Sequence, residues 1–90
     1  MERHIVARVD VEHPPKDAEI KLYISPDCPY CARAIAYYGH EGIAYTTYDA
    51  QNNETLRDEM FRYTKDDPTV PAIVINGEYI QSGWGSPPRG

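Results

Sequence analysis

Hydrophobic and polar residues follow two periods along the chain, and the changes of period divide it into elements. Residues 19–25 alternate with the two-residue period of a strand. From residue 29 to residue 40 the apolar side chains fall at helical spacing, and glycines mark the exit. Residues 43–49 are rich in β-branched and aromatic types, so they predict a second strand.

The middle of the chain predicts a second helix over residues 52–65. Asn52 or Asn53 could cap its first turn. Its buried stripe would consist of Leu56, Met60 and Tyr63.

A hairpin is expected to follow this helix. The segment 72–76 is an apolar strand, Asn76-Gly77 is a typical two-residue turn, and residues 78–81 form the returning strand. The predicted order is therefore β-α-β-α-β-β, in which the first two strands are parallel and the last two antiparallel. This is an α/β fold, a mixed four-stranded sheet with flanking helices.

Both ends of the chain lie outside this pattern. Residues 4–11 alternate cleanly, and we expect them to form an extra N-terminal edge strand beside strand 43–49. The glycine- and proline-rich end of the chain excludes a final helix, so Trp84 and Tyr79, or a second protomer, should cover the exposed apolar face. The expected division is an N-terminal extension over 1–18, a domain over 19–85 and a short irregular tail over 86–90.

Composition and charge narrow the function. The 90 residues allow one small domain, and a net charge of −5 argues against nucleic acid as a partner. No apolar run is long enough for a membrane span, and the N-terminus has no apolar signal-peptide core. We therefore expect a cytoplasmic protein with no membrane partner.

Cys28 and Cys31 are the two cysteines of the chain and form a C-x-x-C motif. Pro29 suits the first turn of a helix, which places Cys28 at the helix N-terminus beside unpaired N–H groups and the positive end of the dipole. That environment favours the nucleophilic thiolate. Cys31 follows within the first turn, where it could attack a mixed disulfide formed at Cys28.

The two cysteines allow two other interpretations. A structural zinc site requires four ligands, but His4, His13 and His40 form no ligand pair and a second C-x-x-C is absent, so no metal is expected. Two inert buried thiols are the other alternative, which a proline inside the motif at a strand-to-helix turn disfavours.

The motif C-P-Y-C, followed about 40 residues later by T-V-P, a strand, N-G and a strand, resembles the glutaredoxins over about residues 19–85. The resemblance implies a thioredoxin-like fold of the glutaredoxin type and a dithiol–disulfide oxidoreductase. Such a protein reduces protein or low-molecular-weight disulfides and serves electron transport and cell redox homeostasis. It also implies that Pro71 is cis and faces the cysteines, that Tyr30 flanks the site, and that the backbone of Val70 pairs with a bound thiol peptide.

Site residues follow from this resemblance and from the motif. Catalysis is assigned to Cys28 and Cys31, with support from Pro29, Tyr30 and Pro71. The residues expected to bind a glutathione-like thiol peptide are Tyr30, Thr69, Val70, Pro71, Ser82, Gly83 and Trp84. For Trp84, packing over the sheet is expected ahead of a role in a partner surface.

The segments GIAYTTYDA and NGEYIQSGW are similar to NrdH-type redoxins, which have an S-G-aromatic turn where Ser82, Gly83 and Trp84 stand here. This resemblance implies ribonucleotide reductase as a partner and thioredoxin reductase as the reductant instead of glutathione. Ser25 occupies the place of a lysine that binds a glutathione carboxylate in glutaredoxins.

Acidic residues also bear on the choice of reductant. Asp27, Asp66 and Asp67 should repel anionic glutathione unless Lys65 or Arg33 compensates. Glutathione remains a candidate co-substrate, with no tightly bound cofactor. The alternative of another class is an iron–sulfur cluster carrier, because the resemblance includes glutaredoxins that hold such a cluster between two protomers with the first cysteine and glutathione.

Overall fold

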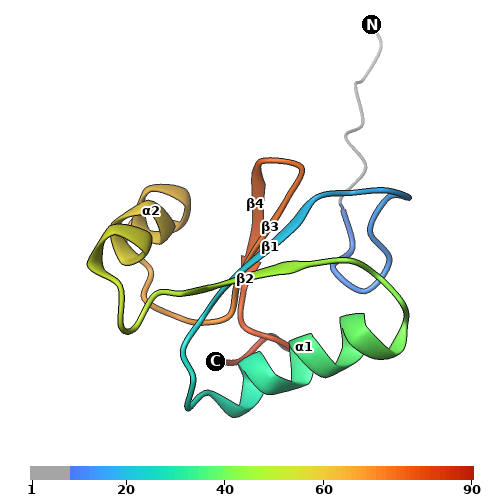
Figure 1. The fold of residues 1–90 in the computed structure, drawn as a ribbon, viewed down its shortest axis with the longest axis horizontal. Helices are drawn as coiled ribbons and strands as arrows, with labels where there is room; N and C mark the ends of the chain where they lie inside the picture. Colours follow the sequence, from blue (N-terminus) through green and yellow to red (C-terminus); the bar gives the residue numbers. More distant parts are fainter. Residues whose placement is uncertain (1–8) are drawn as a thin grey trace, which may run out of the picture.

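The computed structural model describes residues 9–90 (Figure 1). Its elements, in chain order, are β1 (Ile20–Ile24), α1 (Pro29–His40), β2 (Thr46–Asp49), α2 (Glu54–Thr64), β3 (Ala72–Ile75) and β4 (Glu78–Ser82). The four strands form one sheet in the order β2-β1-β3-β4, in which β1 pairs parallel with β2 while β3 pairs antiparallel with both β1 and β4. The predicted mixed four-stranded sheet and its element order are confirmed.

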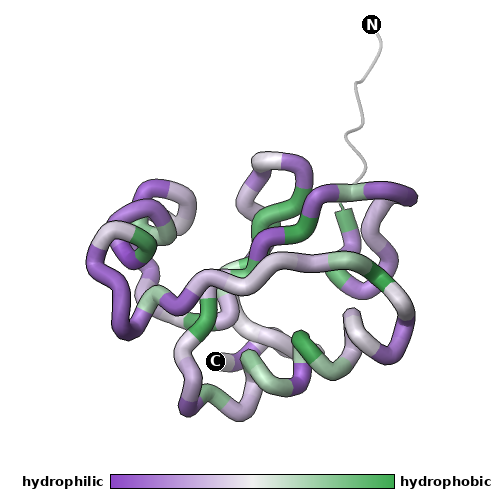
Figure 2. The backbone as a smooth tube through the Cα atoms, viewed as in Figure 1, coloured by the Kyte–Doolittle hydropathy of each residue, from purple (hydrophilic) through white to green (hydrophobic). Residues whose placement is uncertain are grey.

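The two helices cover opposite faces of the sheet (Figure 1). Side chains of successive residues in a strand point to opposite faces, so Leu22 packs with α1 residues while Tyr23 packs with Met60 of α2. All four residues of β3 are buried, and the apolar colouring is concentrated in β1 and β3 (Figure 2). The core therefore consists of two apolar clusters separated by the sheet.

Helix α1 has the bounds that the sequence predicts. Pro29 lies in its first turn, and Cys28 is the N-cap. The helix ends where Gly42 takes a φ of 70° and the Ile43 N–H donates to the Tyr38 carbonyl at 2.9 Å. Because residues 41–43 close the helix, β2 begins at Thr46, three residues later than expected.

Helix α2 is capped by Asn53, whose side-chain oxygen accepts the Leu56 N–H at 3.0 Å. Of the predicted stripe, Met60 is buried, whereas Leu56 and Tyr63 are half-buried. Neither α2 nor α1 combines the length and apolar character that crossing a membrane requires, and these are the helices of residues 9–90.

The predicted hairpin turn is present between β3 and β4. Asn76 and Gly77 have φ values of 53° and 80°, the left-handed conformation that a two-residue hairpin turn needs at both positions. The Asn76 N–H donates to the Glu19 carbonyl at 2.8 Å, which ties the turn to the start of β1.

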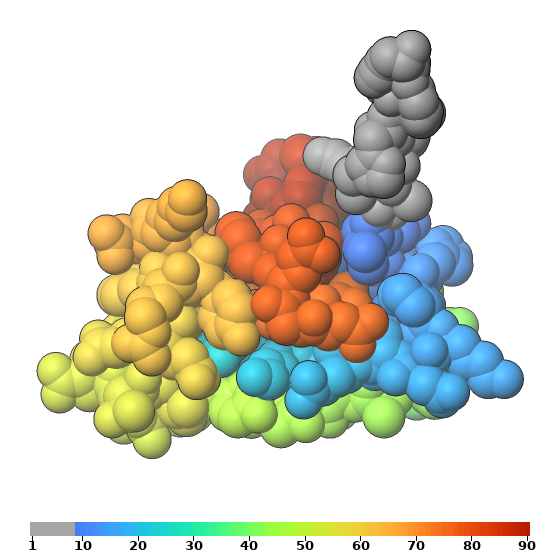
Figure 3. Space-filling model, turned by 90° about the horizontal axis from the view of Figure 1, so that it is seen from above, coloured from blue at the N-terminus to red at the C-terminus, as the bar shows by residue number. Residues whose placement is uncertain are grey.

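The predicted N-terminal edge strand over residues 4–11 is wrong for the part that the structure describes; residues 4–8 lie outside the described residues. The chain reverses after Asp10, whose carboxylate accepts the Glu12 N–H at 2.9 Å, and a bridge pairs Asp10 with His13. The Val11 carbonyl accepts the Tyr38 hydroxyl at 2.6 Å, so it bonds to α1 and not to β2. This segment lies beside the β3–β4 hairpin (Figure 3).

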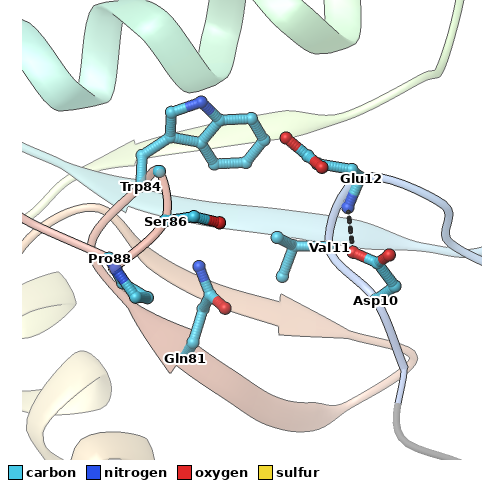
Figure 4. Close-up of a pocket in the computed structure, with 8 residues that line it drawn as sticks. Asp10, Val11, Glu12, Gln81, Trp84, Ser86 and Pro88 are labelled. Carbon is cyan, nitrogen blue, oxygen red and sulfur yellow. Dashed lines mark hydrogen bonds between the residues drawn. The ribbon is translucent and has the colours of Figure 1, made fainter.

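The chain after β4 forms a turn, in agreement with the predicted absence of a final helix. We call residues 84–90 the C-terminal turn; Trp84 and Arg89 close it by exchanging two backbone hydrogen bonds of 2.8 and 3.0 Å. Trp84 is 8% exposed, and its ring lies 5.5 Å from that of Tyr37 and 5.6 Å from that of Tyr38. Trp84 faces Val11 and Glu12 across a small cavity (Figure 4). The packing role expected of Trp84 is therefore confirmed, with Val11 as an additional neighbour.

Candidate active site

Cys28 lies between β1 and α1, at the helix N-terminus as predicted. Its backbone is extended, with φ −95° and ψ 113°, and its sulfur accepts the Cys31 N–H at 3.1 Å. The same sulfur lies 3.6 Å from the Val70 carbonyl oxygen. The residue is partly exposed, so the Cys28 sulfur is accessible to a substrate disulfide.

Cys31 differs from Cys28 in being 2% exposed. Burial, followed by a hydrogen bond between the two thiol side chains, raises the pKa of the Cys31 thiol to about 12. Cys31 therefore remains protonated at neutral pH, while Cys28 is the thiol that can meet a substrate. No third cysteine, histidine or carboxylate joins them as a metal ligand within residues 9–90.

The segment from Thr69 to Pro71 faces Cys28 through the Val70 carbonyl. The Val70–Pro71 peptide bond is cis, as the resemblance implies. Asp67 shapes this segment, because its carboxylate accepts the Thr69 N–H at 2.9 Å, and this bond lowers the pKa of the Asp67 carboxyl. Asp67 is thus bound to the backbone of the loop that carries Val70.

Tyr30 stands at the rim of the site in the first turn of α1, directly after Pro29. It is half-buried, and the guanidinium carbon of Arg33 lies 5.0 Å from the centre of its ring. This distance is typical of a cation–π contact. The aromatic ring beside the cysteines therefore carries a cation on its face.

The three residues after Gln81 each contact another part of the protein. The Ser82 hydroxyl lies 2.7 Å from that of Tyr79, and the Gly83 N–H donates to the Pro71 carbonyl at 2.7 Å. Trp84 is buried against α1. Binding of a thiol peptide by these residues stays a prediction.

Two cavities flank the cysteine site. The first, which we call the α2-side pocket, has a volume of about 260 Å³ and is lined by Ile24, Ser25, Ala50, Gln51, Arg57, Met60, Phe61, Pro68 and Val70. The Ser25 hydroxyl donates to the Gln51 side chain, and the Arg57 guanidinium donates to the Gln51 carbonyl at 3.1 Å. Its polar groups are thus bonded to one another.

The second cavity, which we call the turn-side pocket, has a volume of about 300 Å³. It is lined by Tyr30, Arg33, Trp84, Gly85, Ser86, Pro87 and Arg89. The C-terminal turn carries Arg89 to the first turn of α1, near the chain end marked C (Figure 1).

The C-terminal turn also reaches the Val70 carbonyl beside Cys28. Gly90 lies so close to the Val70 carbonyl oxygen that a Cβ atom there would overlap it. Sequence reasoning missed Arg89 and Gly90 as neighbours of the site. The glycines and prolines after residue 82 signal a turn but not where it packs.

A sheet of this topology, with helices on both faces and a C-x-x-C motif at the N-terminus of α1, defines a thioredoxin-like fold. Comparison with known proteins agrees, because the glutaredoxin family model matches residues 20–80. The chain therefore belongs to the glutaredoxin family.

Individual relatives support the same family. The chain is similar to glutaredoxin 3 of Escherichia coli strain K12, with 32% identity over 63 residues, which cover 70% of this chain and 75% of that protein. Among solved structures, the thioredoxin-like protein BC3987 superposes with a TM-score of 0.64 at 29% identity, covering 76% of this chain and 90% of that one. Glutaredoxin 1 from Francisella tularensis, solved with cacodylate, gives a TM-score of 0.55 at 31% identity, and the match covers 72% of this chain and 83% of that one.

Proposed function

We propose that the protein is a dithiol–disulfide oxidoreductase that reduces protein or low-molecular-weight disulfides through Cys28 and Cys31. The observation that carries the proposal is the asymmetry of the two thiols. Cys28 is partly exposed and accepts the Cys31 N–H at 3.1 Å, whereas Cys31 is buried and its pKa is raised to about 12. Membership of the glutaredoxin family supports the same activity.

The reaction proceeds in two exchanges. The Cys28 thiolate attacks one sulfur of the substrate disulfide, forming a mixed disulfide and releasing the first substrate thiolate. Cys31 then loses its proton and attacks the Cys28 sulfur, which releases the second substrate thiolate. The substrate disulfide gains two electrons and, with two protons, becomes two thiols; the chain is oxidised to the Cys28–Cys31 disulfide.

Formation of the mixed disulfide also prepares the second exchange. Part of the raised pKa of Cys31 comes from its hydrogen bond and charge interaction with Cys28. That part disappears when the Cys28 sulfur is covalently bound, so Cys31 is easier to deprotonate after the first exchange than before it.

The reductant that recharges the protein is either glutathione or thioredoxin reductase, and we favour the second. Ser25 stands where glutaredoxins carry a lysine, and its hydroxyl is bonded to Gln51. The turn of Ser82, Gly83 and Trp84 resembles that of NrdH-type redoxins, whose partner is ribonucleotide reductase. Such a dithiol cycle belongs in the cytoplasm, where thiols are kept reduced.

Two reducing systems test the proposal. Turnover of a protein disulfide is measured with NADPH and thioredoxin reductase, and separately with glutathione and its reductase. We expect turnover with the first system to exceed that with the second, and Cys28→Ser to abolish both. Turnover that is faster with glutathione would contradict the choice of reductant, and activity retained in Cys28→Ser would contradict the proposed function.

A further inference from the structure

The turn-side pocket holds two arginines that reach it from separate parts of the chain. Arg33 comes from α1, and Arg89 comes from the C-terminal turn, whose backbone is fixed by the paired hydrogen bonds with Trp84. The two ion pairs within residues 9–90, His13–Asp10 and His40–Glu41, involve neither arginine. Arg33 and Arg89 are exposed and share one cavity. Within residues 9–90, neither forms an ion pair with a carboxylate.

The position of the cavity gives these charges a role at the thiol. Tyr30, which is next but one to Cys28, lines the cavity and carries the Arg33 guanidinium over its ring at 5.0 Å. The C-terminal turn also places Gly90 against Val70, whose carbonyl oxygen is 3.6 Å from the Cys28 sulfur. The cavity therefore borders Tyr30 beside the motif, and the turn that carries Arg89 also contacts the residue whose carbonyl lies next to the Cys28 sulfur.

The two arginines of this cavity are opposite in sign to the net charge of the chain. The chain has a net charge of −5, and in the sequence Asp27 directly precedes the motif while Asp66 lies three residues before Thr69. Two like charges at one cavity repel each other, and a carboxylate placed between them relieves that repulsion. Guanidinium groups also match a carboxylate through paired hydrogen bonds.

We propose that Arg33 and Arg89 select disulfide substrates that carry an acidic side chain beside the reacting cysteine. The Asp or Glu carboxylate of a peptide or protein substrate would enter the turn-side pocket while its disulfide meets Cys28. This inference rests on the proposed function, because it names the substrate class of that site. It makes both arginines specificity-determining residues.

Single-turnover kinetics test the inference without any external reductant. The fully reduced protein is mixed with the disulfide-linked dimer of a short peptide whose one cysteine is flanked on both sides by glutamate. The same measurement is made with glutamine in place of glutamate. The second-order rate constants of the two oxidations are compared at low and high salt.

We expect the glutamate peptide to react about fivefold faster at low salt, since exposed ion pairs contribute modestly and are screened by salt. Arg33→Gln or Arg89→Gln should each reduce this ratio, and the double variant should bring it to about one. Arg33→Lys, which keeps the charge, should retain part of the preference. The matched control is Arg62→Gln on α2, which removes the same charge far from the pocket and should leave the ratio unchanged.

Three results would overturn the inference in distinguishable ways. Equal rates for the two peptides in the wild-type protein would show that the arginines do not select acidic substrates. A larger effect of the double variant on oxidised glutathione than on the glutamate peptide would assign the pocket to glutathione. If neither peptide oxidises the reduced protein, the proposed function fails, and the inference fails with it.

Discussion

The two pockets beside Cys28 are similar in volume but are built from different kinds of structure. The α2-side pocket is formed by β1, α2 and the loops next to them, and its polar groups are bonded internally, as the Ser25–Gln51 contact shows. The turn-side pocket depends on the C-terminal turn, and it presents Arg33 and Arg89. The comparison teaches that regular elements and short loops line one pocket, whereas in the other an irregular segment brings Arg89 next to Arg33 of α1.

The largest expected effect comes from removing the Trp84 side chain, with which the C-terminal turn begins. Trp84 is 8% exposed and contacts Tyr37 and Tyr38, so Trp84→Ala should lower the free energy of unfolding by about 3–5 kcal/mol. Phe61→Ala is the control in the α2-side pocket and should cost less, because Phe61 is only half-buried. Urea denaturation measures both, and a smaller loss for Trp84→Ala than for Phe61→Ala would contradict this view of the turn.

A second prediction concerns the close packing of Gly83 against the backbone of Arg89. Gly83 has a φ of 94°, and a Cβ atom there would lie 2.8 Å from the backbone nitrogen of Arg89. Gly83→Ala should therefore cost about 1–3 kcal/mol and also remove the preference for acidic peptides. Gly42→Ala is the matched control, since Gly42 has a φ of 70° but no heavy atom within 4 Å of such a Cβ. Equal losses of stability in the two variants would show that Arg89 is not held against Gly83.

The regular elements were predictable because their signals are local. The proline after Cys28 and the helical spacing that follows predict α1 with its observed bounds, and Asn76-Gly77 predicts the hairpin turn. The position of Cys28 follows from these signals alone. For this reason the sequence predicts that Cys28, the proposed nucleophile, lies at the N-terminus of α1.

The two terminal segments were not predictable because distant contacts determine them. The alternation that includes Val9 and Val11 fits a strand, yet the carbonyl of Val11 bonds to the Tyr38 hydroxyl, 27 residues away. The pairing of Arg89 with Trp84 and the contact of Gly90 with Val70 leave no periodic pattern. The turn-side pocket could therefore not be predicted from the sequence.

Cys31 is buried, and its burial predicts a pH dependence of stability. In the unfolded reduced chain its thiol loses a proton near the ordinary pKa of 9.0, but in the folded protein it does so near 12. Between these values the unfolded state binds fewer protons, so stability falls as pH rises. Tyr23 and Tyr38, whose pKa values burial also raises, add to this loss in every variant.

Comparing wild type with Cys31→Ala isolates the cysteine contribution. Unfolding of the reduced proteins is followed by urea denaturation at several pH values from about 8 to 11. We expect the wild type to lose stability more steeply than Cys31→Ala above about pH 9. Parallel curves would show that Cys31 titrates normally in the folded protein.

The smallest expected effect concerns the α2-side pocket. Ser25→Lys adds a cation where the family has one, so turnover with glutathione should rise about two- to fivefold, as exposed ion pairs allow. Ser25→Met is the control, because it adds a side chain of comparable length without charge and also removes the bond with Gln51. An equal gain in both variants would mean that release of Gln51, and not charge, causes it.

The assignment of the two thiols is the central claim, and one trapping measurement tests it most directly. Cys31→Ser and Cys28→Ser are each incubated with a peptide disulfide, and the products are digested without reductant and analysed by mass spectrometry. Cys28 is partly exposed and Cys31 is buried, so Cys31→Ser should accumulate a mixed disulfide on Cys28, and Cys28→Ser should accumulate none. A peptide adduct on Cys31 of Cys28→Ser, with none on Cys28 of Cys31→Ser, would reverse the roles and contradict the account.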